Sequence, residues 1–323
     1  MAATPSLEDP RSGSPDELHP GRAPRSRGDR LFAGTARSAA LVILAALAGV
    51  FLFLTIEGLP GLNRPASTYA PHADFLAYVA PLVFGTILSA LLALVLAVPF
   101  AFGIALFISH YAPKRLAVPV AYVIDLLAAV PSVVFGLWGA RVLAPALVPV
   151  QGFLDDHASW VPFFAGPASV TGRTMFTAAI VLAIMILPIT TAISREIFAQ
   201  TPRLNEEAAL ALGATRWEMV RLTVFPYARS GMVSAVMLGL GRALGETMAV
   251  AMVLSASPVV TLNLISNTNP ATVASNIASS FSEATPDKLN VLIATGLVLF
   301  AVTFAVNFAA RWVVGRSERR MNR

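Results

Sequence analysis

Two opposite charges stand close together in an otherwise apolar stretch of the chain. The stretch GLGRALGETMAVAMVL covers residues 239–254 and contains Arg242 and Glu246, which are four positions apart. Four residues are about one turn of a helix, so both side chains can share one helix face. An arginine at the centre of a bilayer costs roughly 2.5–3.5 kcal/mol on insertion scales, so we expect Arg242 to face a polar interior.

This charge pair allows two interpretations. The first is an ion pair that fixes helix packing, although a buried pair is weak evidence of stabilisation. The second is an anion path, because a guanidinium is always charged and its donors match the oxygens of an oxyanion. On that hypothesis Arg242 binds the anion briefly. Glu246 holds the arginine in place and lowers its affinity for the anion. Gly239, Gly241 and Gly245 form a pattern of small residues that predicts close helix packing.

The composition excludes several kinds of protein. The chain of 323 residues is 56% hydrophobic and only 13% charged, whereas soluble domains are about 25% charged. It has no cysteine, which excludes disulfides and thiolate sites. Neither lysine follows a glycine, so there is no P-loop, and the four histidines form no ligand pattern. We therefore predict no metal site, no cofactor and no catalytic residues, and an intramembrane enzyme is disfavoured because the spans hold no nucleophile with a base.

Apolar runs of about 20 residues mark helices that cross a bilayer. The sequence predicts an all-α integral membrane protein with six transmembrane helices at residues 38–58, 82–108, 118–138, 175–194, 232–255 and 290–313. The third span is interrupted by Pro131 and Gly136. The predicted outer loops are 59–81, 139–174 and 256–289, and the last two are long enough to form short helices and a docking surface.

The basic residues indicate how the chain is oriented. Eighteen of the 23 Lys and Arg residues fall on the side of the two termini, and four fall on the other side. The positive-inside rule therefore predicts that both termini are cytoplasmic. Because the net charge of +5 follows from this topology, we expect no nucleic-acid partner.

The predicted cytoplasmic segment between spans four and five contains signals for two short helices. Thr201 followed by Pro202 predicts a helix start, and Gly213 suits the left-handed position that ends the helix. Thr215 and Glu218 are spaced as a capping box, which predicts the start of a second helix. We expect that helix to end or bend at Pro226.

This predicted hairpin has two interpretations. Its first helix is rich in alanine, and its surface of small side chains could fit into a groove on another protein. Alternatively, the hairpin is an amphipathic connector on the membrane surface.

The spacing of this segment resembles a known motif. Glu207-Ala208-Ala209, followed by Gly213 and Pro226, is similar to the EAA loop of the permeases of ABC importers. In that family the loop docks into a cytoplasmic ATPase subunit, and the glycine makes the turn. Thr223 and Phe225 depart from the isoleucine and leucine that the family prefers there, and both are packing positions.

Four blocks resemble one family of these permeases more closely. The blocks are LLAAVPSVVFGLWG, LPITTAISREIF, EEAALALGATRWEMVR and GLGRALGETMAV, and they look like the PstC permease subunits of bacterial phosphate importers. The resemblance implies a type I ABC-importer permease fold, a multi-pass location in the bacterial inner membrane, and phosphate as substrate. It also implies three partners, namely a second, PstA-like permease subunit, a PstB-like ATPase dimer and an extracytoplasmic PstS-like phosphate-binding protein.

With this resemblance, the chain divides into four predicted regions. They are a disordered basic cytoplasmic tail at 1–34, the first transmembrane helix and outer loop at 35–74, a permease domain at 75–315 and a cytoplasmic tail at 316–323. The permease domain contains the ATPase-docking loop at 195–231. Two other functions stay open from the residues alone: a permease for another oxyanion, such as sulfate or molybdate, and a membrane scaffold or sensor without transport.

A few further polar residues have weaker signals. Asp125, in the third span, is expected to pair with a basic group near the inner surface. Arg195 and Glu196 follow the fourth span, where they could support the docking loop. Asp155, Asp156 and His157 suggest a metal site by type, but three adjacent polar residues in an outer loop are more often simply solvated.

Overall fold

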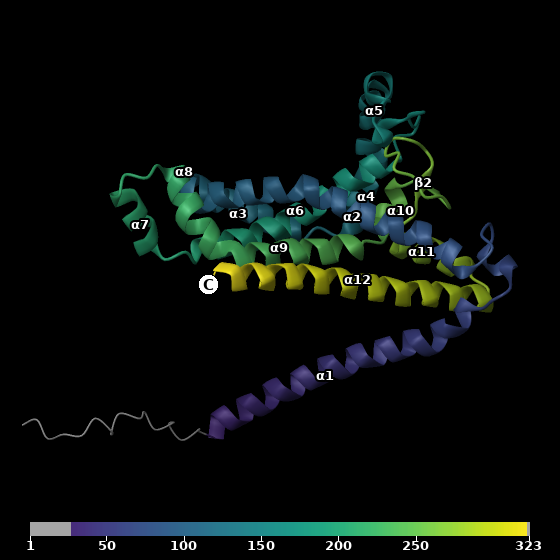
Figure 1. The fold of residues 1–323 in the computed structure, drawn as a ribbon, viewed down its shortest axis with the longest axis horizontal. Coiled ribbons are helices and arrows are strands. Elements are labelled where there is room, and N and C mark those ends of the chain that lie inside the picture. Colours follow the sequence, from purple (N-terminus) through teal and green to yellow (C-terminus); the bar gives the residue numbers. More distant parts are fainter. Residues whose placement is uncertain (1–26, 322–323) are drawn as a thin grey trace, which may run out of the picture. The chain divides into compact units, whose positions relative to one another are not determined.

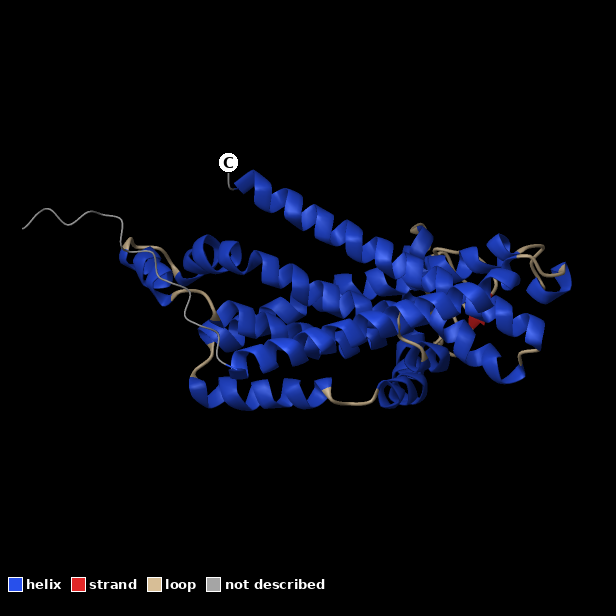
Figure 2. Cartoon of the chain, turned by 90° about the horizontal axis from the view of Figure 1, so that it is seen from below, coloured by secondary structure: helices blue, strands red, loops and turns tan. Residues whose placement is uncertain are grey.

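The computed structural model describes residues 27–321, and this part of the chain is almost entirely helical (Figures 1 and 2). Residues 1–26 of the predicted disordered tail (1–34) lie outside the described residues. Its remaining part, residues 27–34, begins helix α1 (Arg27–Gly58), so the predicted tail boundary is too late. The C-terminal helix α12 (Pro286–Met321) includes residues 316–321, so that much of the predicted second tail is helical.

The contacts divide the chain into two units, residues 1–51 and 52–323. The described part of the first unit belongs to α1, an apolar helix whose side chains are nearly all exposed. An apolar helix with no buried face is typical of a helix that lies in lipid.

The second unit is built around four long helices. α2 (Phe75–Leu106), α6 (Met175–Ala199) and α9 (Phe225–Leu244) pack against one another, and α12 packs against α2 and α9. Helices in a bilayer gain little from leaving lipid, so their association depends on close van der Waals packing. α2 provides this with alanines at every third or fourth position, each at most 1% exposed: Ala90, Ala93, Ala97, Ala101 and Ala105.

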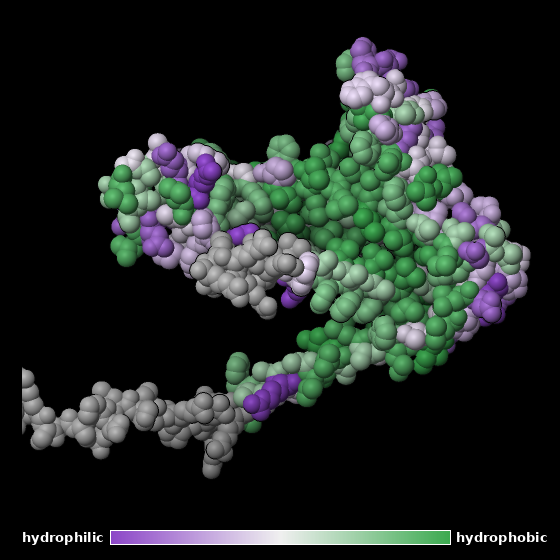
Figure 3. Space-filling view, viewed as in Figure 1, coloured by the Kyte–Doolittle hydropathy of each residue, from purple (hydrophilic) through white to green (hydrophobic). Residues whose placement is uncertain are grey.

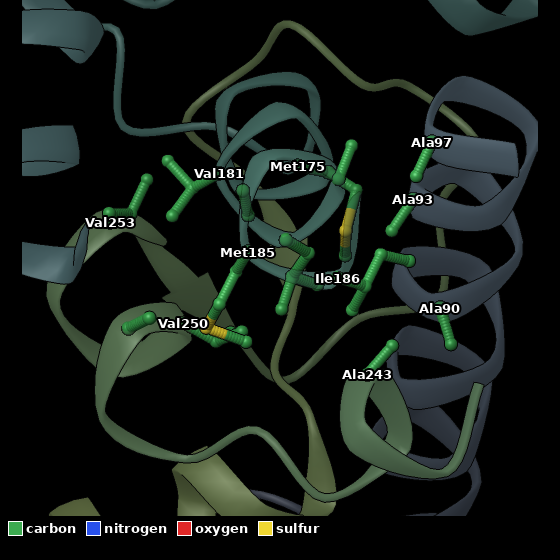
Figure 4. Close-up of a cluster of buried hydrophobic side chains, with 14 of the residues drawn as sticks. Ala90, Ala93, Ala97, Met175, Val181, Met185, Ile186, Ala243, Val250 and Val253 are labelled. Atoms are coloured by element: carbon green, nitrogen blue, oxygen red, sulfur yellow. The ribbon is translucent and has the colours of Figure 1, made fainter. Parts of the chain in front are cut away.

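Figure 4 shows the hydrophobic side chains that pack around these alanines. Ile186 of α6 lies toward the alanines of α2 and Ala243 of α9, and Met185 lies on the other side, next to Val250. The large side chains of one helix thus fill the space that the small side chains of its neighbours leave.

Shorter elements connect the long helices. They are η2 (Leu59–Leu62), η3 (Ala66–Tyr69), the π-helical η4 (Phe107–Tyr111), α3 (Lys114–Ala128), α4 (Ser132–Trp138), the π-helical η5 (Gly139–Leu143), α5 (Ala144–Ala158), η6 (Pro162–Phe164), α7 (Arg203–Ala211), α8 (Arg216–Met219), the π-helical η7 (Val220–Val224), α10 (Met248–Val253), β1 (Ala256–Ser257), β2 (Asn269–Pro270), α11 (Val273–Ser280) and η8 (Phe281–Glu283). β1 and β2 pair in parallel.

The described residues contain five helices that are long and apolar enough to span a membrane: Leu31–Leu62, Phe75–Tyr111, Ser132–Ala158, Met175–Ala199 and Pro286–Trp312. Four of them correspond to the predicted spans 38–58, 82–108, 175–194 and 290–313. The other, Ser132–Ala158, begins within the predicted third span and continues into the predicted outer loop 139–174. The predicted third and fifth spans, 118–138 and 232–255, are not continuous helices. The third is divided between α3 and α4 at Pro131, as the proline predicts, and the fifth is divided between α9 and α10.

The hydrophilic parts of the second unit lie at its two ends. α7 and α8 lie at one end, and α11 and the strands lie at the other (Figure 1). The surface between them is apolar, with hydrophilic side chains gathered near α7 and α8, on α5 and in the loops around α11 (Figure 3). This distribution suits a bundle whose middle is in lipid and whose ends are in water.

Candidate functional site

The helix that carries the two intramembrane charges is broken between them. α9 ends at Leu244, Gly245 is its C-cap, and α10 begins at Met248. The prediction that Arg242 and Glu246 share one face of a continuous helix is therefore wrong. Non-helical backbone at membrane depth is tolerated where it is buried in protein or lines a cavity, and in transporters such breaks mark substrate sites.

Glu246 binds the start of the helix that follows it. Its Oε1 accepts a hydrogen bond of 3.0 Å from the backbone N–H of Ala249, and the residue is 8% exposed. A carboxylate there satisfies a free N–H and complements the positive end of the helix dipole. No ion pair joins Glu246 to Arg242 in the described part of the chain, so Glu246 positions α10 and does not hold the arginine directly.

Arg242 lies in the last turn of α9, where its positive charge complements the negative end of that helix. Its side chain is half-buried, and its Nε is fully buried without a hydrogen-bond partner among the described residues. A buried guanidinium N–H without a partner is costly. The site therefore retains unused hydrogen-bonding capacity that is matched to an oxyanion.

The two broken helices meet on the outer side of their breaks. α4, which follows Pro131, packs against α10, which follows Glu246. Gly136 permits this approach, because a Cβ there would lie 2.8 Å from the Cα of Ala249. Gly136 is thus a packing residue inside α4, and the interruption of the third span is due to Pro131.

Arg173 fixes the other end of α10, a role that the sequence analysis missed. Its Nε donates to the carbonyl oxygen of Met252 at 3.1 Å, and a terminal nitrogen of its guanidinium donates to the same oxygen. The six-residue α10 thus has a carboxylate at its positive end and a guanidinium at its negative end.

The three glycines near the break differ in their surroundings. A Cβ on Gly239 would lie 2.9 Å from Oγ1 of Thr190 in α6, so this glycine serves close helix packing. At Gly241 a Cβ would meet nothing within 4 Å in the described chain. Its packing role stays a prediction. Gly245 is the C-cap of α9, and we place its role there in ending the helix.

The predicted helical hairpin is present between α6 and α9. α7 is followed by Gly213 at φ +88°, the left-handed conformation that the sequence predicts. Thr215 Oγ1 accepts from the N–H of Glu218 at 3.3 Å, and Glu218 Oε2 accepts from the N–H of Thr215 at 2.8 Å, so the capping box is confirmed. The hydroxyl of Thr215 also donates to Glu218 Oε2 at 2.8 Å. The bond from the backbone N–H of Thr215, and then the bond from its hydroxyl, lower the pKa of the Glu218 carboxyl.

Two details of the hairpin differ from the prediction. The N-cap of α7 is Pro202, and the hydroxyl of Thr201 is buried without a hydrogen-bond partner among the described residues. Pro226 does not end the second helix, because the chain passes from α8 through η7 into α9 without leaving helical structure. Pro226 lies in the first turn of α9, directly after the π-helical η7.

The hairpin presents an apolar surface that the second unit does not cover. Glu207 and Ala208 are exposed, Ala209 is partly buried, and no residue of α7 is fully buried. The concave side forms a hollow of about 840 Å³ lined by Ala208, Ala209, Gly213 and their neighbours. Leu212 and Leu222 also line it, and the hairpin carries three further exposed apolar side chains: Leu204, Leu210 and Trp217. Such a patch beside a concave face is typical of a protein interaction site.

Comparison with known proteins agrees with this arrangement. Residues 97–323 match the family described as "Binding-protein-dependent transport system inner membrane component". The chain is 49% identical over 304 residues to the phosphate transport system permease protein PstC 2 of Mycobacterium tuberculosis, covering 90% of this chain and 93% of that protein. It is 46% identical over 301 residues to the phosphate transport system permease protein PstC of Mycobacterium leprae, covering 90% and 94%.

The chain belongs to the PstC family of permease proteins.

The fold of this permease also resembles a solved structure. A crystal structure of a bacterial ABC transporter involved in the import of the acidic polysaccharide alginate matches 88% of this chain and 99% of that chain, with a TM-score of 0.52 and 17% identity. At that identity the likeness concerns the fold alone. The permease is thus an all-helical, multi-pass inner-membrane protein with the fold of an ABC-importer membrane subunit, and ATP hydrolysis takes place in a partner subunit.

The hairpin of this PstC-family permease rests on a buried aromatic cluster. Phe198, at the end of α6, is 0% exposed, and its ring centroid lies 6.3 Å from Phe102 and 6.2 Å from Phe225. Met219 and Ala209 of the hairpin pack on the same cluster. The hairpin is thus connected by packing to the ends of α2, α6 and α9.

Structural partners are present for four other polar residues of the permease: Asp125, Arg195, Asp155 and His157. Asp125 pairs with Arg195 at 3.4 Å, which confirms the predicted basic partner and shows that Arg195 supports α3. Asp155 Oδ2 accepts from the N–H of Ala168 at 2.9 Å, and His157 stacks on Phe153. Within the described residues no group of three or more His, Cys, Asp or Glu side chains is placed to hold a metal ion.

Proposed function

We propose that this permease carries inorganic phosphate across the membrane as half of a translocation pathway, and that Arg242 lines that pathway. The observation that carries the proposal is the buried Nε of Arg242, which has no hydrogen-bond partner in the described chain and lies beside a helix break. The names of the relatives, which are phosphate transport system permeases, support phosphate as the oxyanion.

The residues at the break are suited to binding phosphate briefly and then releasing it. A guanidinium can donate two parallel hydrogen bonds to a phosphate as the ion loses its water. Because Arg242 also faces the negative end of the α9 dipole, part of its charge is already compensated. We expect this compensation to weaken the hold on phosphate enough for release.

The proposed assembly contains the partners of the PstC family. The apolar hairpin around Glu207, Ala208, Ala209 and Gly213 is the proposed docking site of a PstB-like ATPase dimer. A PstA-like permease subunit would form the other half of the pathway, and a PstS-like phosphate-binding protein would deliver phosphate to the outer loops. In this scheme α6 and α9 transmit motion from the hairpin to the break, since both helices connect the two places.

Uptake of radiolabelled phosphate tests the proposal. Cells that lack the gene are complemented with wild type, Arg242→Ala or Arg242→Lys, and uptake is measured with and without excess sulfate. We expect wild type to restore uptake that sulfate does not compete, Arg242→Ala to abolish it, and Arg242→Lys to restore only part, since lysine lacks the planar fork. Arg141→Ala, which removes an exposed arginine, is the matched control.

Two results would overturn parts of this proposal. Normal transport by Arg242→Ala at equal membrane levels would make Arg242 a structural residue. Uptake of sulfate in place of phosphate by wild type would make the substrate wrong while leaving the permease assignment intact.

A further inference from the structure

A second polar site lies at the outer end of the bundle, beyond the end of α10. It is a pocket of about 260 Å³ between the start of α2, α11, the start of α12 and the loops around Pro71 and Ser257. Its polar lining consists of Lys288, Tyr78, His72, Asn276, Ser257 and Ser280. No carboxylate is among the described residues that line it.

Lys288 supplies a positive charge that is not neutralised. Its Nζ donates to the carbonyl oxygen of Thr68 at 3.1 Å and lies 4.2 Å from the ring centroid of Tyr78. An ammonium has three donors and the carbonyl takes one of them, while the ring attracts the charge only weakly. The ammonium is therefore held in position with donors to spare.

The neighbouring carboxylates are occupied elsewhere. Asp287 lies 2.8 Å from the guanidinium of Arg64, which also donates to Asn290. Asp74 caps α2 by accepting from the N–H of Ala77 at 2.8 Å. No ion pair joins Lys288 to a carboxylate among the described residues, so its charge stays available to an anion.

Tyr78 adds an oriented hydroxyl donor. Its oxygen accepts a hydrogen bond of 2.8 Å from the side-chain amide of Asn276. Because the amide hydrogen occupies one lone pair, the hydroxyl proton is directed elsewhere, and no acceptor for it appears in the described part of the chain. The imidazole of His72 lies edge-on to the same ring, with centroids 6.2 Å apart.

We infer that this outer pocket binds a phosphate group, with Lys288 as the charged donor and Tyr78 as the neutral one. A lysine is a common point-charge partner of phosphate, and hydroxyl groups supply its further hydrogen bonds. Two sources present that chemistry here: inorganic phosphate entering from the outer side, or the headgroup phosphate of a phospholipid. The first source rests on the proposed function, whereas the second does not.

The binding test uses the whole transporter complex in a phosphorus-free detergent, with inorganic phosphate as the probe. Broadening of the phosphate resonance in phosphorus NMR reports weak binding. We expect Lys288→Met to reduce the broadening several-fold, Lys288→Arg to retain most of it, and Tyr78→Phe to reduce it while keeping the ring under Lys288. Lys114→Met removes the only other lysine, which is exposed at the start of α3, and should leave the broadening unchanged.

A second measurement distinguishes inorganic phosphate from a phospholipid headgroup as the bound group. Native mass spectrometry counts the phospholipids that stay bound to the same complexes. Loss of one retained phospholipid in Lys288→Met, with phosphate broadening unchanged, assigns the pocket to a lipid headgroup. The inference is overturned if Lys288→Met and Lys114→Met match wild type in both arms. Phosphate uptake by the same variants separates this result from the proposed function, because uptake that fails in wild type would contradict the substrate without emptying the pocket.

Discussion

The imidazole Nε2 of His110 lies 3.3 Å from Oε1 of Glu206. His110 belongs to η4, the π-helical turn that ends α2, and Glu206 precedes the Glu-Ala-Ala sequence of α7. The other ring nitrogen, Nδ1, lies 2.7 Å from the hydroxyl of Ser109, which fixes the ring from the other side. The proposed docking helix is therefore tied directly to a core helix by a pair of side chains that are mostly buried.

This contact predicts that His110→Ala weakens coupling without abolishing ATP hydrolysis. A hydrogen bond of this kind contributes about 0.5–1.5 kcal/mol, which is roughly a two- to tenfold change in an equilibrium constant. ATP hydrolysis by the complex, measured with and without the binding protein, should lose part of its stimulation in His110→Ala and in Glu206→Ala. His157→Ala, on the exposed side of α5, is the control. Full stimulation in both variants would mean that the contact does not transmit motion.

Gly213 is expected to tolerate little change. Its φ of +88° is in the left-handed region, while a Cβ there would meet nothing within 4 Å in the described chain. The cost of Gly213→Ala is thus backbone strain alone, about 1–2 kcal/mol. Gly213→Asn should cost less, since asparagine enters this region more readily. Co-purification of the ATPase subunit with each variant measures the effect, and equal recovery with Gly213→Ala would show that docking does not need this turn.

The capping box predicts a pH dependence of the hairpin. The bonds from Thr215 place the folded pKa of Glu218 below its unfolded value. The stabilisation is therefore present above the unfolded pKa and is lost as the pH falls through the folded pKa. Hydrogen exchange of residues 215–219 should be slower in wild type than in Glu218→Gln near neutral pH, and the difference should vanish in acid. A difference that persists at low pH would indicate a role that does not depend on the carboxylate.

The sequence predicts the local features of the hairpin and the first break because their signals are local. Gly213, the Thr215–Glu218 box and Pro131 each act within a few residues of themselves. The second break has weaker local signals, with Gly245 as the C-cap of α9 and Thr247 as the N-cap of α10 but no proline, and glycine also fits the pattern of close helix packing. Periodicity alone therefore extends the helix across it.

The contacts that hold the site are distant in sequence. Arg173 and Met252 are separated by 79 positions, and His110 and Glu206 are separated by 96. An arginine in an outer loop or a histidine at the end of a span has many possible partners. Only the packing of α4, α6 and α10, and of α2 against the hairpin, selects among them.

Arg173→Gln is expected to loosen the outer end of α10. Glutamine cannot place two donors on the carbonyl of Met252, and it removes the charge that faces the helix end. The side chain is exposed, so we expect membrane levels of the permease near those of wild type and phosphate uptake reduced several-fold. Arg141→Gln, an exposed arginine of η5, provides the matched comparison. Unchanged uptake would mean that α10 keeps its position without Arg173.

Two substitutions of Glu246 separate the hydrogen bond that its carboxylate accepts from the effect of its negative charge. Glu246→Gln keeps an oxygen that can accept from Ala249 but loses the charge at the helix start, a loss of about 0.3–1 kcal/mol at an exposed site and up to ~2 kcal/mol in a partly buried one. Glu246→Ala loses both. If the carboxylate only positions α10, uptake should fall in the order wild type, Gln, Ala, with the dependence on phosphate concentration unchanged. If its charge also weakens the hold of Arg242 on phosphate, Glu246→Gln should slow transport at saturating phosphate more than it disturbs the position of α10. Hydrogen exchange of the backbone amides of residues 248–253 can report whether α10 stays in place, independently of transport.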